Sequence, residues 1–126
     1  GATAFQKGLG AIHALSHPIG AIFNTHHGTT NAVCMPAVLK LNAPKIRDRF
    51  ELAASYIGIE GGFDGFCEFV QGFNHILGIP RRLSEMGVTE DRMEDLVDLA
   101  LQDPSCGGNP VTLTADNVNA LFRDCI

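Results

Sequence analysis

The 126-residue sequence lacks any run of lysine or arginine, and its nine basic residues are outnumbered by fourteen acidic ones, for a net charge of −5. Without a basic patch there is little to attract phosphate groups, so neither nucleic acid nor an anionic membrane is expected as a partner. The apolar runs are far too short to span a bilayer. Nothing at the start resembles a signal peptide, because no basic segment precedes an apolar run and a cleavage site.

The sequence also lacks the paired cysteine spacing of zinc fingers and thioredoxin-like proteins. Its four cysteines, Cys34, Cys67, Cys106 and Cys125, are widely scattered. Without a secretion signal, we interpret them as reduced thiols of a cytoplasmic protein that pack as small buried hydrophobes.

No stretch shows the sustained alternation of a β-strand, and the length suits one domain. Helical spacing of apolar residues covers residues 4–17, a continuation over 19–23 beyond Pro18, then about 29–41, 44–57, 64–77, 89–101 and 114–125. The expected caps or first residues of the later helices are Thr29 or Thr30, Pro44, Asp64, Thr89 and Thr114. The sequence therefore predicts an all-α fold, a compact bundle of five to seven helices.

Two details of this prediction can be checked in the structure. Asn42-Ala43-Pro44 is expected to separate two helices. The helix over 64–77 is expected to turn its large apolar side chains inward: Phe66, Phe69, Val70, Phe73 and Leu77.

Histidine is strongly clustered, since His13, His17, His26 and His27 fall within fifteen positions. His13 and His17 are four apart and would share one face of a helix, whereas the neighbours His26 and His27 must diverge. A site would thus use one or both of the first pair and one of the second. Imidazole suits iron, zinc, nickel and copper, and the other interpretation is ordinary surface or core histidines. The fifth histidine, His75, is interpreted as a surface residue.

The loop from Asp103 to Val111, DPSCGGNPV, is the second unusual stretch, because two prolines and two glycines impose a special path. Gly8 and Gly10 weaken the first helix and indicate a close approach of another helix or a ligand.

The stretch GLGAIHALSHPIGAIFNTHHGTTNAVCMPAVLKLN resembles the C-terminal helical domain of the iron-containing (group III) alcohol dehydrogenases. The shared pattern is a histidine, a second one four residues on, Pro-x-Gly, and a third followed by Gly and Asn-Ala. The segments GIPRRLSEMGV and DPSCGGNP are similar to later parts of that domain, so the resemblance covers residues 1–126.

The resemblance implies a two-domain enzyme that interconverts an alcohol and an aldehyde or ketone with NAD or NADP, and a metal held by one Asp and three His between the domains. By position His13 and His27 match metal ligands, and His17 matches a catalytic histidine near the nicotinamide that passes protons. Phe5 matches an aromatic residue that packs near the nicotinamide. The implied metal is Fe²⁺, with Zn²⁺ or another divalent ion as alternatives.

Residues 1–126 depart from the family pattern by lacking the other two ligands and the Gly-rich dinucleotide-binding segment. We therefore expect this chain to be a piece of a longer protein, inactive by itself, whose partners are a Rossmann-like N-terminal domain, a small alcohol or aldehyde, and a second copy in a homodimer. The alternatives are a non-catalytic helical metal-binding or interaction module, or a relative of maleylacetate reductase or glycerol dehydrogenase. Gly28 and Asn31-Ala32 favour the alcohol dehydrogenases, while Val111 replaces an Arg common in them.

Overall fold

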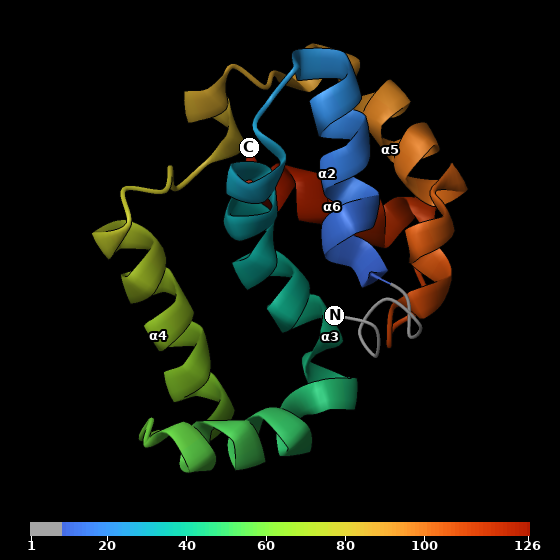
Figure 1. Cartoon of the computed structure of the whole chain (residues 1–126). Helices are drawn as coiled ribbons and strands as arrows, with labels where there is room; N and C mark the ends of the chain where they lie inside the picture. Colours follow the sequence, from blue (N-terminus) through green and yellow to red (C-terminus); the bar gives the residue numbers. More distant parts are fainter. Residues whose placement is uncertain (1–8) are drawn as a thin grey trace.

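A computed structural model describes residues 9–126, and over that range the regular structure is entirely helical. In chain order the elements are α2 (Gly10–Phe23), α3 (His27–Ile57), α4 (Gly62–Ile76), the 3₁₀ turns η1 (Leu83–Met86) and η2 (Glu90–Arg92), α5 (Met93–Gln102), the 3₁₀ turn η3 (Pro104–Gly108) and α6 (Ala115–Cys125). Figure 1 shows α2, α3, α5 and α6 gathered into a bundle, with α4 standing along one side. The predicted all-α class is confirmed. None of the helices in this range combines the length and the hydropathy needed to cross a membrane.

Helix α2 contains Pro18 and runs on to Phe23, which agrees with the continuation over 19–23 expected beyond this proline. A proline inside a helix lacks one backbone hydrogen bond. Burial of Ala14, Leu15 and Ile19 on the inner face compensates for that loss. Asn24 then ends the helix in the left-handed region at φ 53°, a conformation that asparagine tolerates. The part of the predicted first helix before residue 9 lies outside the described residues.

Helix α3 corrects the prediction of a boundary at Asn42-Ala43-Pro44, because it is one helix of 31 residues from His27 to Ile57. Pro36 and Pro44 both lie inside it. The ribbon changes direction sharply before its second half (Figure 1), so the chain bends without leaving the helix. A proline in a helix interior has this effect when surrounding contacts hold the flanking turns.

Helix α4 packs on α3 through a small second core in which Leu39, Phe63 and Val70 are buried. The predicted inward face is wrong in part. Phe69 and Phe73 are each 49% exposed and Leu77 is 58% exposed, while Val70 is buried as expected. A helix covered by one neighbour buries a narrow stripe only, so the rest of a broad apolar face stays in contact with solvent. The helix also begins earlier than predicted, with Gly61 and not Asp64 as its N-cap.

The C-terminal half matches its prediction closely. Thr114 caps α6 by accepting a hydrogen bond from the Asn117 N–H, and the Asn117 side chain accepts one from the Thr114 N–H in return. Val118, Leu121 and Phe122 of α6 are buried, as are Leu96, Val97 and Ala100 of α5. Thr89 precedes the 3₁₀ turn η2 instead of capping α5 directly.

The amide of Asn109, just beyond η3, joins three distant parts of the chain. Its Oδ1 accepts from the Ala11 N–H at 3.1 Å and from Asn42 Nδ2 at 2.9 Å. Its Nδ2 donates to Asn42 Oδ1 at 2.8 Å and to the Val111 carbonyl at 2.7 Å. This saturates the hydrogen-bonding capacity of the side chain. Gly10 leaves room for it, because a Cβ there would lie 3.4 Å from Asn109 Oδ1 and the residue has φ +71°.

We expect Asn109→Ala to lower the free energy of unfolding by about 2–4 kcal/mol, because partly buried partners would lose their hydrogen bonds. Urea denaturation measures this loss. Asn119→Ala is the matched control, since Asn119 makes an exposed contact with Arg123 and its loss should change stability by less than about 0.5 kcal/mol. Equal effects of the two substitutions would contradict a clamping role for Asn109.

Candidate functional site

Three of the clustered histidines meet where α2 packs against the start of α3. His13 and His17 lie one turn apart on α2, and His27 is the first residue of α3. The ring centroids are 5.6 Å apart for His13 and His17, 5.2 Å for His13 and His27, and 5.4 Å for His17 and His27. The short link from Asn24 to His26 reverses the chain and places the start of α3 beside α2.

The Nε2 atoms of His13 and His27 face a common point. Asn31, one turn after His27 on α3, places its Nδ2 at 3.1 Å from His27 Nε2 and at 3.5 Å from His13 Nε2. An amide NH₂ can only donate, so in this arrangement both ring nitrogens present lone pairs. Two lone pairs directed at one region are the start of a metal coordination shell.

The surroundings of His13 favour its neutral form. Its pKa is lowered from the ordinary histidine value first by burial and then by the nearby His27 and His17 rings. A metal ligand must be an unprotonated imidazole, so this shift favours ligation. Within residues 9–126 the His13 Nδ1 and Asn31 Oδ1 atoms are buried without a hydrogen-bond partner.

His17 makes a different contact. Its Nδ1 lies 2.7 Å from Oδ2 of Asp103, the residue that precedes η3, and the other Asp103 oxygen accepts from the Ser105 N–H at 2.7 Å. Burial by itself would raise the pKa of Asp103, but the hydrogen bonds from Ser105 and His17 outweigh it and lower the pKa below the ordinary value. Asp103 was missed as a site residue. The sequence marked its loop as unusual, but no spacing rule connects it to His17.

His26 turns away from this group, as expected for neighbours in sequence. It is the N-cap of α3, and its Nδ1 accepts from the Thr29 N–H at 3.3 Å. The prediction that Thr29 or Thr30 would cap the helix is therefore wrong. Thr30 instead lies inside the first turn, where its hydroxyl donates to the His26 carbonyl at 3.0 Å. An imidazole nitrogen can perform the capping role usually taken by a side-chain oxygen.

The described residues do not by themselves form a complete metal site. No group of three or more His, Cys, Asp or Glu side chains within residues 9–126 could hold a metal ion. His13 and His27 fit a metal as two nitrogen ligands and leave the remaining positions to be filled from elsewhere. His17 contacts Asp103 through Nδ1, so this nitrogen is not available to a metal. Phe5 lies outside the described residues, so its predicted place near a nicotinamide stays a prediction.

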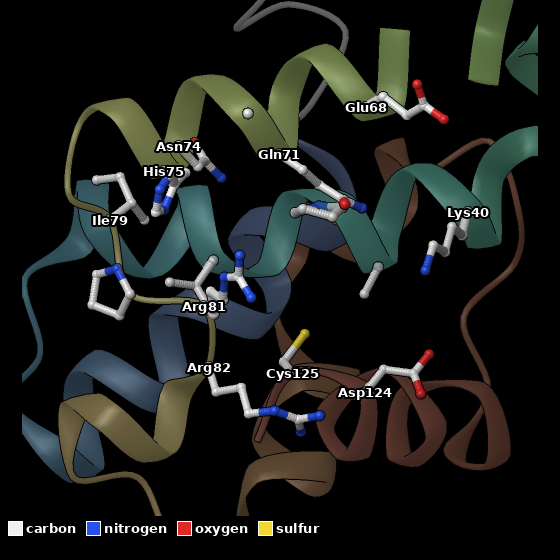
Figure 2. Close-up of a pocket in the computed structure, with 15 residues that line it drawn as sticks. Lys40, Glu68, Gln71, Asn74, His75, Ile79, Arg81, Arg82, Asp124 and Cys125 are labelled. Atoms are coloured by element: carbon white, nitrogen blue, oxygen red, sulfur yellow. The ribbon is translucent and has the colours of Figure 1, made fainter. Parts of the chain in front are cut away.

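A cleft of about 750 Å³ lies elsewhere, between α3, α4 and the segment that follows α4. His75, which is exposed as predicted, contributes to its wall. Figure 2 shows Arg81 and Arg82 on one side of the cleft and Glu68 on α4 on the other. None of the three grouped histidines lines it, so it is separate from the candidate metal site.

Two packed helices that bring the His13 and His27 rings together define an all-α domain with a histidine cluster between α2 and α3. Residues 2–126 match the family described as "Fe-containing alcohol dehydrogenase family, C-terminal", and the chain belongs to that family. It is 41% identical over 132 residues to 4-hydroxybutyrate dehydrogenase of Cupriavidus necator, which covers 98% of this chain and 34% of the relative. It is 33% identical to lactaldehyde reductase of Escherichia coli K12, covering 92% of this chain and 32% of that enzyme.

Solved structures of related proteins contain the same helical fold. The crystal structure of a 1,3-propanediol oxidoreductase superimposes with a TM-score of 0.87 at 27% identity, over 94% of this chain and 33% of the other. An iron-containing alcohol dehydrogenase of Thermococcus thioreducens gives a TM-score of 0.82 at 29% identity, over 93% of this chain and 32% of the other. The chain thus spans about a third of the length of the relatives that it matches.

The contrast between the adjacent histidines is testable. We expect His26→Ala to destabilise the protein by about 1 kcal/mol through loss of the α3 N-cap, and His26→Asn to restore stability because asparagine caps well. Thermal unfolding measures both. Neither substitution should change the affinity for a divalent metal, and a loss of metal binding in both variants would show that His26 and not only its neighbour belongs to the site.

Proposed function

We propose that this chain is the metal-binding part of an NAD(P)-dependent dehydrogenase that interconverts a small alcohol and its aldehyde or ketone. The observation that carries the proposal is the approach of His13 Nε2 and His27 Nε2 to one point, at 3.5 and 3.1 Å from the same Asn31 atom, in a chain of this family. The activity belongs to the longer protein, since this chain spans about a third of its relatives.

His13 and His27 would hold the metal through their Nε2 atoms. Fe²⁺ is proposed because the family is iron-containing, and Zn²⁺ suits the same nitrogen ligands. When bound, such an ion supplies Lewis acidity toward an alcohol or carbonyl oxygen. The remaining ligands would come from residues that precede this chain in the complete protein.

His17 would act as the proton relay. It lies beside the two proposed ligands, its side chain is 43% exposed, and its Nδ1 is already engaged by Asp103, so Nε2 is the atom available to take a proton. The hydride would pass to NAD or NADP, chemistry that the nicotinamide supplies. The dinucleotide would be bound by a Rossmann-like domain ahead of this chain, with Phe5 packing near its ring.

The substrate class follows from the relatives. Their printed names include 4-hydroxybutyrate dehydrogenase and lactaldehyde reductase, so we propose a short hydroxylated substrate. 4-Hydroxybutyrate is the first to assay because that relative has 41% identity.

Further partners are proposed from exposed apolar surface. Tyr56 is 83% exposed at the end of α3, and Ile76 is 80% exposed at the end of α4. The rest of the polypeptide, or a second copy in a homodimer, would cover such surface. We also propose a cytoplasmic location, in which the four cysteines would stay reduced thiols.

In the complete enzyme we expect His13→Ala and His27→Ala to remove bound metal and activity together. His17→Ala should retain the metal and lower kcat by about 10²- to 10⁴-fold, the usual contribution of general acid–base catalysis. Metal analysis and steady-state kinetics on the same samples separate the two effects. Loss of metal from His17→Ala would overturn its role as a relay.

For the 126-residue chain alone we expect weak metal binding, because two imidazoles leave most of the coordination shell to water. Calorimetric titration with Zn²⁺ should show a dissociation constant above about 1 μM, weaker than the apparent affinity of complete structural zinc sites. The His13→Ala variant is the control and should abolish the signal. Submicromolar binding would show that the chain itself contains further ligands.

A further inference from the structure

The contact between His17 and Asp103 joins two residues that are 86 positions apart in sequence. His17 lies on α2, and Asp103 lies at the end of α5. The two atoms in contact, Nδ1 and Oδ2, are 2.7 Å apart. The His17 side chain is 43% exposed, whereas that of Asp103 is 12% exposed. The carboxylate is therefore the better buried and more firmly placed partner.

We propose that Asp103 is a positioning residue that holds the neutral His17 ring in the tautomer with its proton on Nδ1, so that the Nε2 lone pair is free. An ionised carboxylate can only accept hydrogen bonds, so a ring nitrogen at this distance must carry the proton. The inference rests on the relay role proposed for His17. It adds that Asp103 is the group that keeps His17 Nε2 able to accept a proton.

Asp103 is held independently of His17. Its Oδ1 accepts from the Ser105 N–H, which makes it the N-cap of η3. The far end of the same loop is tied by Asn109 to Ala11 and Asn42. Oδ1 of Asp103 therefore accepts a hydrogen bond from the loop, and Oδ2 contacts the imidazole. Rotation of the carboxylate would break both contacts.

The His17 ring is also fixed in its plane. It stacks on the His27 ring with an interplanar angle of 16° and a centroid distance of 5.4 Å. Stacking limits tilt of the ring, and the hydrogen bond to Asp103 sets its rotation about χ2. Because Nδ1 points to Asp103, Nε2 points away from it.

In alcohol oxidation the O–H bond of the substrate would break as an N–H bond forms at His17 Nε2. The resulting imidazolium would lie beside the ionised Asp103, which stabilises the positive charge. The same proton would then pass to water from the exposed side of the ring, which returns His17 to its starting tautomer. The hydride leaves separately with the nicotinamide of the proposed function, so both hydrogens are accounted for.

The substitution that tests the inference is Asp103→Asn. The asparagine oxygen can still accept from the Ser105 N–H and keep the η3 cap, but the group facing His17 becomes an NH₂ donor. His17 should then place its proton on Nε2 and present a lone pair at Nδ1. We expect ¹⁵N NMR of histidine-labelled, chelator-treated protein at pH 9, far above the ordinary imidazole pKa of about 6.5, to show this exchange of tautomers. His17→Gln identifies the signal.

Asp98→Asn is the matched control, because Asp98 is an exposed carboxylate on α5 and its replacement removes the same charge. It should leave the His17 tautomer unchanged. An unchanged tautomer in Asp103→Asn, or an Nε2-protonated ring in the unsubstituted protein, would overturn the inference.

Kinetics of the complete enzyme separate this inference from the proposed function. We expect Asp103→Asn to lower kcat by about 10- to 100-fold, within the range of proton-transfer effects, with metal content and KM unchanged. A changed tautomer with unchanged kcat would refute the relay role of His17, while the positioning by Asp103 would stand.

Discussion

The amide of Asn109 is the interaction on which the rest of the arrangement depends. It ties the loop after α5 to the first turn of α2 and to the middle of α3, using every donor and acceptor that it has. Because Asp103 begins that loop, the clamp also helps to fix the carboxylate that contacts His17. A partly buried amide network of this kind is stabilising only when every member has a partner, because each broken hydrogen bond leaves a polar group unsatisfied.

The candidate site results from a helical hairpin. His13 and His17 share one face of α2, and the tight reversal at Asn24 places His27 against them. The site draws on two kinds of contact, namely lone pairs directed at Asn31 and a carboxylate at His17, while His26 lies outside it as the N-cap of α3. Adjacent histidines thus take separate roles because successive side chains at a helix start point in different directions.

The prediction of fold from sequence succeeded where an element is covered on its inner face by the main core, as with α5 and α6. It failed in part for α4, whose apolar residues exceed what α3 can cover, so that Phe69 and Phe73 remain exposed. The periodicity of apolar residues shows which side chains share a helix face, but the number of neighbouring helices decides how much of that face is buried. The boundary expected at Pro44 failed for a related reason, because the packed turns on either side hold the helix together across the bend.

The sequence by itself determined the all-α class, the last two helices, the grouping of histidines and the resemblance to a family, because these follow from spacing along the chain. Only the tertiary structure decided which histidines meet, that Asn31 lies between two of them, and that Asp103 belongs to the site. Those contacts join residues up to 98 positions apart, as between Ala11 and Asn109, and local propensity carries no information about them. Long-range partners are selected by packing and by the need to satisfy buried polar groups, and both arise only in the folded chain.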